Sequence, residues 1–353
     1  MSQMHDEIRQ QPEALERTLS EGLKLTEKLR RRFEKSRPRL IVLAARGTSD
    51  NAALFGRYLL EITTGIPVSL AAPSVFTLYR SSLDMKDTLV VTVSQSGEST
   101  DIDYVLEHAG KYGAATVGIT NEPASTMARL AESTFLVRAG REKSVAATKT
   151  YSGQVLCFYL LAYALGAKIR VEDLRRLPEW AATALTLEKQ IAACAERYRF
   201  MTHAVAVGRG LNYSNAFEFA LKLMETCYVV AERFSISDFQ HGPIAMVEQS
   251  FPVFMFAPSG VTWPTTKEML TRLDHLKADT LLITDRSNKE VQKMGRSTIT
   301  VPLRLGRANA VPEELYTPIP YIIPAQLFAA CLASDKGLDP DHPRSLSKVT
   351  RTL

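Results

Sequence analysis

Cysteine is scarce in this chain, and its few copies are widely spaced. The 353 residues include four cysteines, at positions 157, 194, 227 and 331, and no two of them form a Cys-x-x-Cys pair. This spacing indicates free thiols in a reducing compartment rather than a disulfide framework. The six histidines are equally scattered. Because no His or Cys pair has metal-ligand spacing and no organic-cofactor motif is present, we expect neither a metal nor an organic cofactor.

Long hydrophobic runs are missing as well. No apolar stretch approaches the length needed to span a bilayer, and the polar start from Met1 to Arg9 does not resemble a signal peptide. We therefore expect a cytoplasmic protein without a membrane partner. The net charge of +5 is mild, and the densest basic run, residues 28–39, lacks a groove-reading motif. Nucleic acid is thus not an expected partner, whereas a small anionic substrate fits the charge.

The sequence does contain two series of alternating strand and helix patterns, which predict an α/β protein with parallel sheets. The expected strands are 40–44, 67–71, 89–93, 115–119 and 133–137 in the first series, and 204–208, 252–257, 279–284 and 297–301 in the second. The expected organisation is a helical segment at 1–35, one or two helices long, a first domain at 36–167, a helical linker at 168–199, a second domain at 200–335 and a tail at 336–353.

The two series match each other weakly at a nearly constant offset, which indicates a duplicated unit. Arg46-Gly47 parallels Arg209-Gly210, Ser96-Gly97 parallels Ser259-Gly260, and residues 116–121 parallel residues 280–285. The second series has lost most hydroxyls of the loop around Ser96. We therefore expect the first series to hold an anion and the second to contribute something else.

The most informative stretch is Ser94-Gln95-Ser96-Gly97-Glu98-Ser99. It stands where an apolar, β-branched strand pattern turns into a helical pattern. Hydroxyls, a glycine and the free N–H groups of a helix N-terminus together suit a phosphate. The alternative is an ordinary serine-rich helix cap. A second hydroxyl-rich junction at 46–51 favours the phosphate, because both junctions would lie at the carboxyl edge of one sheet.

Charged groups with chemical potential lie in the second series. Glu218, Lys222 and Glu225 follow helical spacing beside an apolar stripe that we expect to be buried, formed by Phe217, Leu221, Met224 and Tyr228. The spacing alone favours a solvent-exposed ladder of salt bridges. The alternative is a carboxylate and an amine directed into a cleft, where they can move protons on a sugar.

Two further groups are ambiguous from their positions alone. His241 precedes Gly-Pro, and histidine is the residue type best suited to acid–base chemistry near neutral pH, although a single loop histidine is often structural. Lys348 lies in the tail, where chain ends usually fray. It matters only if the tail folds over a site and desolvates the amine, which then suits a Schiff-base nucleophile.

Taken together, these segments resemble the tandem sugar-isomerase (SIS) domain family, notably the isomerase half of glucosamine-6-phosphate synthase and its stand-alone deaminase relatives. The resemblance extends from about residue 25 to the C-terminus. Its motifs are Arg-Gly-Thr-Ser, Ser-Gln-Ser-Gly-Glu-Ser, Ser-Val-Ala-Ala-Thr-Lys, Ala-Leu-Lys-Leu-Met-Glu, His-Gly-Pro and Pro-Arg-Ser-Leu-Ser-Lys. It implies two tandem flavodoxin-like, three-layer α/β/α domains.

The resemblance also implies roles for individual residues. The substrate-binding residues would be Ser94, Gln95, Ser96 and Ser99 around the sugar phosphate, with Gly47, Thr48, Ser49, Val145 and Ala146 lining the rest. Glu225 would shuttle a proton between C1 and C2 of the sugar, and Lys222 would assist at the sugar oxygens. His241 would open the ring and come from a neighbouring subunit, which implies a homodimer. Lys348 matches the tail lysine that reaches the open-chain sugar.

Three residues depart from the synthase pattern, namely Arg46 for Cys, Ser99 for Thr and Ala147 for Ser. The printed chain also contains no glutaminase domain and has no Cys at position 2. We therefore expect a deaminase that converts glucosamine 6-phosphate and water to fructose 6-phosphate and ammonia. The alternatives are a deglycase for 6-phosphorylated fructosamines, a galactosamine-6-phosphate deaminase or isomerase, and a non-catalytic sugar-phosphate sensor.

Overall fold

The computed structural model of the chain describes residues 2–294, 297–303 and 312–348, so residues 349–353 of the expected tail lie outside it. The chain forms two compact units. The first-repeat unit contains Gln10–Lys143, Ala147–Pro178 and Ser345–Leu353, and the second-repeat unit contains Met1–Arg9, Ser144–Ala146 and Glu179–Arg344. Each unit carries one five-stranded sheet.

The sheet of the first-repeat unit is entirely parallel and has the strand order β2-β1-β3-β4-β5. Its strands are β1 (Leu40–Ala44), β2 (Val68–Leu70), β3 (Thr88–Val93), β4 (Ala115–Thr120) and β5 (Ser133–Leu136). All residues of β3 are buried, as expected for a central strand covered on both faces. This strand order is that of flavodoxin-like folds.

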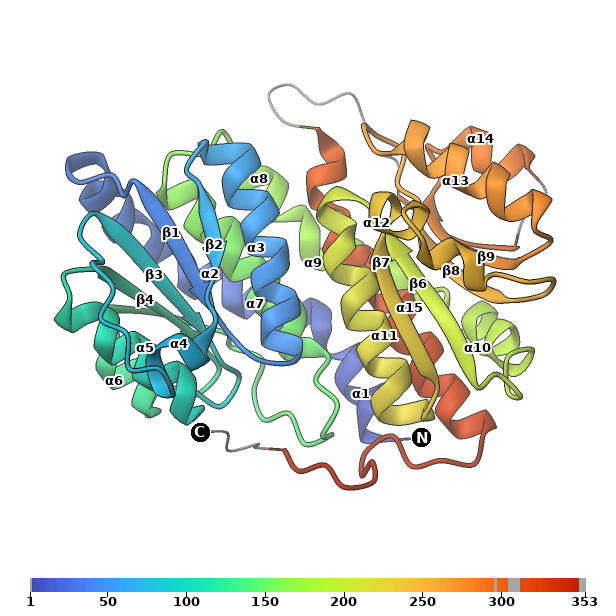
Figure 1. Cartoon of the computed structure of the whole chain (residues 1–353), viewed down its shortest axis with the longest axis horizontal. Coiled ribbons are helices and arrows are strands. Elements are labelled where there is room, and N and C mark those ends of the chain that lie inside the picture. Colours follow the sequence, from blue (N-terminus) through green and yellow to red (C-terminus); the bar gives the residue numbers. More distant parts are fainter. Residues whose placement is uncertain (1, 295–296, 304–311, 349–353) are drawn as a thin grey trace. The chain divides into compact units, whose positions relative to one another are not determined.

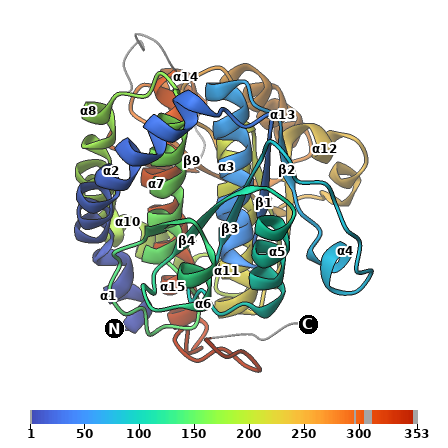
Figure 2. The same cartoon turned by 90° about the vertical axis from the view of Figure 1, so that its left-hand side faces the viewer.

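Helices cover both faces of this sheet (Figures 1 and 2). One layer contains α2 (Gln11–Lys35), α3 (Thr48–Thr64) and α7 (Lys149–Ala164), and the other contains α4 (Pro73–Thr77), α5 (Thr100–Lys111) and α6 (Thr126–Leu130). The apolar stripe of α5, which includes Ile102, Val105 and Leu106, packs against Val42 and Val90 of the sheet. Figure 2 shows α2 and α7 on one side of the strands and α5 on the other.

The second-repeat unit repeats this arrangement element by element. Its strands are β6 (His203–Gly208), β7 (Val230–Ser235), β8 (Pro252–Phe256), β9 (Asp279–Asp285) and β10 (Ser297–Val301), all parallel in the order β10-β9-β8-β6-β7. Its helices are α10 (Glu188–Glu196), α11 (Tyr213–Cys227) and α15 (Pro318–Asp335) on one face, and α12 (Ile236–Gln240), α13 (Trp263–His275) and α14 (Lys289–Lys293) on the other.

The predicted fold of two tandem flavodoxin-like α/β/α domains is confirmed, and the matching strand orders support duplication of one unit. Every expected strand is present, but β7 was missed. This strand lies at the edge of its sheet beside β6, and exposed residues interrupt its apolar pattern. Its counterpart in the first repeat is β2, also an edge strand.

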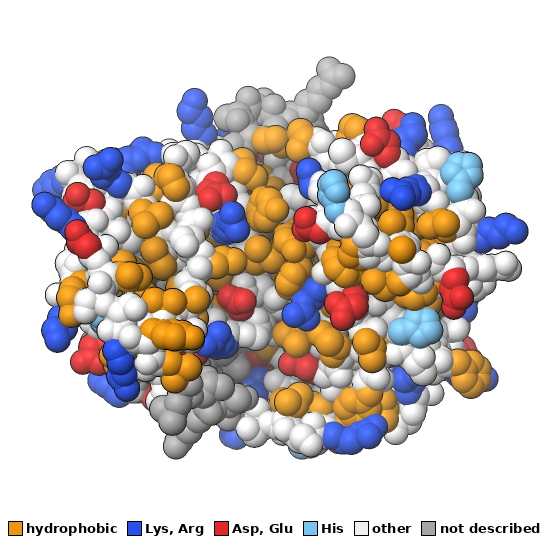
Figure 3. All heavy atoms as spheres, viewed as in Figure 1, with side chains coloured by type: hydrophobic (Ala, Val, Ile, Leu, Met, Phe, Trp, Pro, Cys, Tyr) orange, Lys and Arg blue, Asp and Glu red, His pale blue; other side chains and the backbone are white. Residues whose placement is uncertain are grey.

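The remaining elements lie outside the two sheets. The N-terminal segment forms a helical pair, α1 (Gln3–Arg9) and α2, and the region at 168–199 forms α8 (Val171–Leu174), α9 (Arg176–Leu185) and α10. Among the described residues, no helix is both long and apolar enough to cross a bilayer. On the face drawn in Figure 3, basic and acidic side chains of the described residues are interspersed without a continuous basic surface.

Candidate functional site

The strand order of the first-repeat unit reverses between β1 and β3, and both hydroxyl-rich loops begin there. Parallel α/β sheets bind ligands at the carboxyl ends of the strands flanking such a switch point. The loop after β1 contains Gly47, whose φ of +56° is accessible mainly to glycine, and continues into α3 with Thr48 and Ser49. Ser49 is buried, and its hydroxyl accepts a hydrogen bond of 2.9 Å from Nε2 of Gln154.

The loop after β3 is folded tightly by its own hydroxyls. The Ser94 hydroxyl accepts a 3.1 Å hydrogen bond from the Gly97 N–H and lies 3.0 Å from the Ser99 hydroxyl. The Ser96 hydroxyl accepts a 3.3 Å hydrogen bond from the Glu98 N–H, and the Gln95 carbonyl accepts a hydrogen bond from the Thr120 hydroxyl. The loop therefore holds its four predicted polar residues around one glycine.

Gly97 is required by both its conformation and its surroundings. Its φ is +62°, and an added Cβ would lie 2.3 Å from the Ser125 hydroxyl. Ser99 occupies the N-cap position of α5, but its side chain makes no capping hydrogen bond. The serine-rich cap therefore does not act through Ser99, whose hydroxyl contacts Ser94 instead. This arrangement favours a loop shaped for an anion at a helix N-terminus.

Acidic side chains beside this loop have partners of their own. Asp101, in the first turn of α5, forms a 2.7 Å ion pair with Arg46 of the loop after β1. This ion pair links the loop after β1 to the start of the helix that follows the loop after β3. Glu98 accepts hydrogen bonds from the N–H and hydroxyl of Thr126. Arg46, which departs from the synthase pattern, is thus a structural link between the two segments, and its partner cannot be identified from spacing because the two residues are 55 positions apart.

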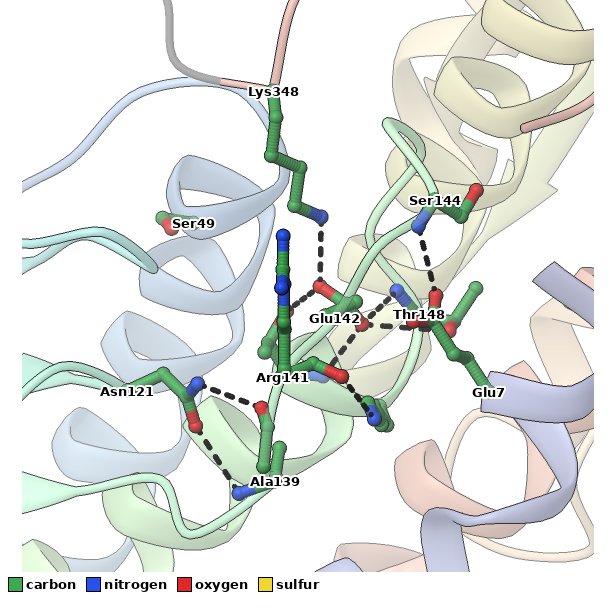
Figure 4. A network of polar contacts seen from close by, with 12 residues as sticks. Glu7, Ser49, Asn121, Ala139, Arg141, Glu142, Ser144, Thr148 and Lys348 are labelled. Atoms are coloured by element: carbon green, nitrogen blue, oxygen red, sulfur yellow. Dashed lines mark hydrogen bonds and ion pairs between the residues drawn. The ribbon is translucent and has the colours of Figure 1, made fainter. Parts of the chain in front are cut away.

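Lys348 has an ordered partner within the first-repeat unit. Its Nζ lies 3.2 Å from Oε2 of Glu142, a fully buried carboxylate in the loop before α7 (Figure 4). Glu142 also accepts hydrogen bonds from the N–H groups and hydroxyls of Thr148 and Thr150. Burial alone would raise the pKa of Glu142, but Lys348 and the bonds from Thr150 and Thr148 outweigh it and lower the pKa. The expected fraying of the tail therefore does not extend to Lys348.

Val145 and Ala146 belong to the second-repeat unit, where the tail and α1 hold them. The N–H of Val145 donates to the carbonyl of Asp341 at 3.3 Å. The preceding Ser144 N–H donates to Oε2 of Glu7 at 3.2 Å (Figure 4). The Asp341 carboxylate in turn accepts two backbone N–H groups at the start of α1. This loop is thus fixed by long-range contacts rather than by its own sequence.

Helix α11 carries the predicted acid–base residues in the second-repeat unit. Nζ of Lys222 lies 2.6 Å from Oε2 of Glu225 and 3.3 Å from Oε1 of Glu218. The Lys222 and Glu218 side chains are completely buried, whereas that of Glu225 is 22% exposed. The expectation of a solvent-exposed ladder is therefore wrong.

The expected buried stripe of α11 is also wrong. Phe217, Leu221, Met224 and Tyr228 are only partly buried, and the apolar residues that pack inside are Phe219, Ala220, Leu223 and Cys227. The helix is apolar on two faces, so its spacing fits either stripe. The charged residues share the covered side of the helix.

Electrostatics keep Lys222 protonated. Burial by itself lowers the pKa of the lysine, but the charges of Glu218 and Glu225 and their hydrogen bonds outweigh it, so the pKa is raised. Lys222 therefore serves as a fixed cation rather than as a base. Glu225 is the member of this cluster that solvent or a ligand can reach.

His241 follows α12 and is exposed at the surface of the second-repeat unit. The backbone N–H of His241 donates to the Asp238 carbonyl at 3.1 Å, and the following Gly242 has a φ of +138°. The structure thus brings predicted residues together at the two loops of the first-repeat unit, and it pairs Lys222 with Glu225 on α11. Lys348, the loop of Val145 and Ala146, and His241 each have contacts of their own outside these groups. Glu142 and Glu218 were not among the predicted site residues. Glu218 had been noted for its spacing, and Glu142 lies next to the Ser-Val-Ala-Ala-Thr-Lys motif.

A sequence profile described as the SIS domain matches residues 35–164 and 201–331. Among curated proteins, the glutamine--fructose-6-phosphate aminotransferase [isomerizing] of Pyrococcus horikoshii is 34% identical over 353 residues. That alignment covers 98% of this chain and 57% of the relative, so the chain spans just over half the length of this relative.

Two solved structures resemble the chain over nearly its whole length. The C-terminal domain of glucosamine-fructose-6-phosphate aminotransferase from Francisella tularensis has a TM-score of 0.86 and 26% identity, covering 97% of this chain and 98% of that chain. A putative phosphosugar isomerase from Silicibacter pomeroyi has a TM-score of 0.84 and 30% identity, covering 97% of this chain and 100% of that chain.

Proposed function

Because this chain belongs to the SIS domain family, with one SIS domain in each repeat, we propose that it catalyses aldose–ketose chemistry on a phosphorylated sugar. The specific reaction we propose is deamination of glucosamine 6-phosphate to fructose 6-phosphate and ammonia. The names of the relatives support the choice of a six-carbon amino-sugar phosphate. The observation that carries the proposal is the Lys222 cluster, in which a buried ammonium adjoins one reachable carboxylate, Glu225.

The phosphate end of the substrate is assigned to the first-repeat unit. The hydroxyls of Ser94, Ser96 and Ser99, together with the N-terminus of α5, suit a dianionic phosphate. Gly47 and Ser49 adjoin the same switch point. Binding at the phosphate, which does not react, provides the free energy that orients the reacting end of the sugar.

The reacting end of the sugar is assigned to Glu225, Lys222 and His241. His241 opens the pyranose by acid–base catalysis. Glu225 removes the C2 proton of the open-chain amino aldose and returns a proton to C1, so an enolamine becomes a ketimine. The Lys222 cation stabilises negative charge that develops on the sugar oxygen. Water then adds to the ketimine carbon, and ammonia leaves. Lys348 is assigned to the open-chain sugar in this step.

Ammonia release tests this function directly. The purified chain is incubated with glucosamine 6-phosphate without glutamine, alongside Glu225→Gln and a control, Glu232→Gln, whose carboxylate is exposed on β7. We expect release by the wild type and by the control, and a loss of at least about 100-fold in Glu225→Gln, since positioned acid–base groups contribute that much or more. Wild-type binding of fructose 6-phosphate without ammonia release would overturn the deaminase. Phosphorylated fructosamines and galactosamine 6-phosphate are the substrates to assay in parallel.

A homodimer that shares His241 between subunits makes a separate prediction. Glu225→Gln and His241→Ala are each expected to be inactive, but their co-expression creates dimers in which one site has both residues intact. About a quarter of all sites then recover activity if subunits pair at random. Recovery would support a histidine supplied by the partner. Failure to recover, with dimers confirmed by mass, would place His241 and Glu225 of one chain in the same site.

A further inference from the structure

The loop after β8 is the counterpart, in the second repeat, of the Ser94–Ser99 loop. Ser259-Gly260 stands where the first repeat has Ser96-Gly97, and Thr262 follows at the place of Ser99. Each loop connects the same strand of its sheet to a long helix, α5 in one case and α13 in the other. Both loops therefore present backbone N–H groups and a hydroxyl at a helix N-terminus, where an anion is stabilised.

In the second repeat these donors already bind acceptors from the same unit. The Asp285 carboxylate accepts 2.8 Å hydrogen bonds from both the N–H and the hydroxyl of Ser259, and a 2.7 Å bond from the Tyr321 hydroxyl. The Glu314 carboxylate accepts a 2.5 Å bond from the Thr262 hydroxyl and a 3.3 Å bond from its N–H. Asp285 is 0% and Glu314 3% exposed, so both carboxylates are interior groups.

Glu314 also fills the space beside the loop glycine. A Cβ added to Gly260 would lie 2.1 Å from Oε2 of Glu314, so the carboxylate contacts the backbone at the glycine. At Gly97 of the first repeat, the nearest atoms belong to Ser125 and Thr120 instead. An internal carboxylate thus lies against the backbone of the loop glycine in the second repeat, whereas hydroxyl side chains lie there in the first repeat.

The residue at the end of the neighbouring strand differs in charge between the repeats. Asn121 follows β4 as a neutral amide, which donates to the Gly140 carbonyl and accepts from the Ala139 N–H (Figure 4). Its counterpart at the end of β9 is Asp285. A phosphate approaching the second loop would therefore meet two buried carboxylates, and charges that share a sign repel strongly in a desolvated site.

We propose that Glu314 and Asp285 are built-in anions that occupy the second repeat's counterpart of the phosphate loop. The second repeat then binds no sugar phosphate, neither as substrate nor as effector, and each chain holds a single phosphate group. The count of one rests on the proposed phosphate site of the first repeat. The occupation of the second loop by carboxylates does not.

Removing the internal anion tests the occupation. Glu314→Ala vacates the cradle, whereas Glu314→Gln fills it with a neutral side chain of the same shape. Thermal unfolding is followed through tryptophan fluorescence, because Trp180 and Trp263 are both buried and Trp263 directly follows Thr262. We expect inorganic phosphate and formate to raise the Tm of Glu314→Ala saturably, by at least about twice the rise seen in the wild type and in Glu314→Gln. Equal rises in all three proteins would overturn the proposal.

Counting bound phosphate in the wild type gives a second test that needs no destabilised variant. Equilibrium dialysis with fructose 6-phosphate is expected to give one ligand per chain, and none per chain in Ser96→Ala. Two ligands per chain, or a site that survives in Ser96→Ala, would overturn the proposal. No binding to the wild type, together with formate rescue of Glu314→Ala, would refute the proposed function and leave the built-in anions supported.

Discussion

The buried cluster on α11 makes a quantitative prediction about stability. Replacing Lys222 with methionine keeps most of the side-chain volume and removes the ammonium. Glu218, whose side chain is 0% exposed, then keeps its position in the interior without that cation. Because a buried charge is costly when its counter-ion is removed, we expect Lys222→Met to be strongly destabilising.

The distances set the size of the effect. The 3.3 Å separation between Nζ of Lys222 and Oε1 of Glu218 corresponds to an attraction of about 5 kcal/mol at an effective dielectric constant near 20. Losses of ~3–5 kcal/mol are typical when one partner of a buried pair is removed. Part of this loss returns if Glu218 is neutralised too. We therefore expect Lys222→Met with Glu218→Gln to be about 2 kcal/mol more stable than Lys222→Met alone.

The chain offers a matched control and a local reporter. Lys267 pairs with Glu290 at 2.6 Å, the distance between Lys222 and Glu225, but both side chains are about half exposed. We expect Lys267→Met to leave the free energy of unfolding nearly unchanged, because exposed ion pairs contribute little. Both tryptophans, at positions 180 and 263, are buried in the second-repeat unit, so urea titrations followed by their fluorescence report on the unit that contains α11.

Activity separates the electrostatic role from the structural one. The double variant is expected to recover stability but not isomerisation, since it lacks the cation at the developing charge. If Lys222→Met unfolded at the same urea concentration as the wild type, the buried ion pairs would not be what holds this cluster. If Glu218→Gln failed to restore stability to Lys222→Met, the cost would come from packing instead.

Three further changes probe the first-repeat unit. Hydrogen bonds to charged groups contribute ~1.5–3 kcal/mol, so Glu142→Gln should speed tryptic cleavage after Lys348 by about tenfold, and an unchanged rate would argue against the tether. Burial, with neighbouring carboxylates, raises the pKa of Asp103 to about 7, above its unfolded value near 3.9. Stability should thus fall as pH rises from about 4 to 8 in the wild type, but less in Asp103→Asn, as urea midpoints would show. Gly97→Ala should cost ~1–3 kcal/mol and abolish phosphate binding, whereas Gly140→Ala, at φ +68° in open space, should cost less and bind normally.

The sequence was sufficient for the architecture because parallel strands buried on both faces are continuous apolar runs. The exception, β7, is an edge strand in which Val230 and Glu232 are exposed, so its pattern is broken. The duplication could have predicted β7. The strand β2 follows α3 in the first repeat, so a strand is expected at the corresponding position after α11 in the second.

The helical spacing of Glu218 and Lys222 does not indicate whether their side chains are buried. Glu218 and Lys222 have the spacing of a surface salt-bridge pair, and the same spacing is found on both exposed and covered helix faces. What buries them is packing of α11 against β6, which precedes it in the chain, and against α15, which lies far away in the chain. The contact between Lys348 and Glu142 is likewise long-range, joining residues 206 positions apart.

Comparison of the two repeats shows how the duplicated unit diverged. Glu225 on α11 corresponds to Glu61 on α3, where the carboxylate accepts a 3.0 Å hydrogen bond from the N–H of Val68 and so anchors the start of β2. By the same offset, the buried Lys222 replaces Tyr58. A buried charge is costly in a position that an aromatic side chain can fill, so the presence of Lys222 in the second repeat only fits the role proposed for it. The loops after β3 and β8 differ as well. The loop after β3 keeps its hydroxyls, whereas in the loop after β8 Asp285 and Glu314 accept hydrogen bonds from the loop donors. Under the proposed function, each repeat therefore carries one half of the chemistry and fills the other half with structural contacts.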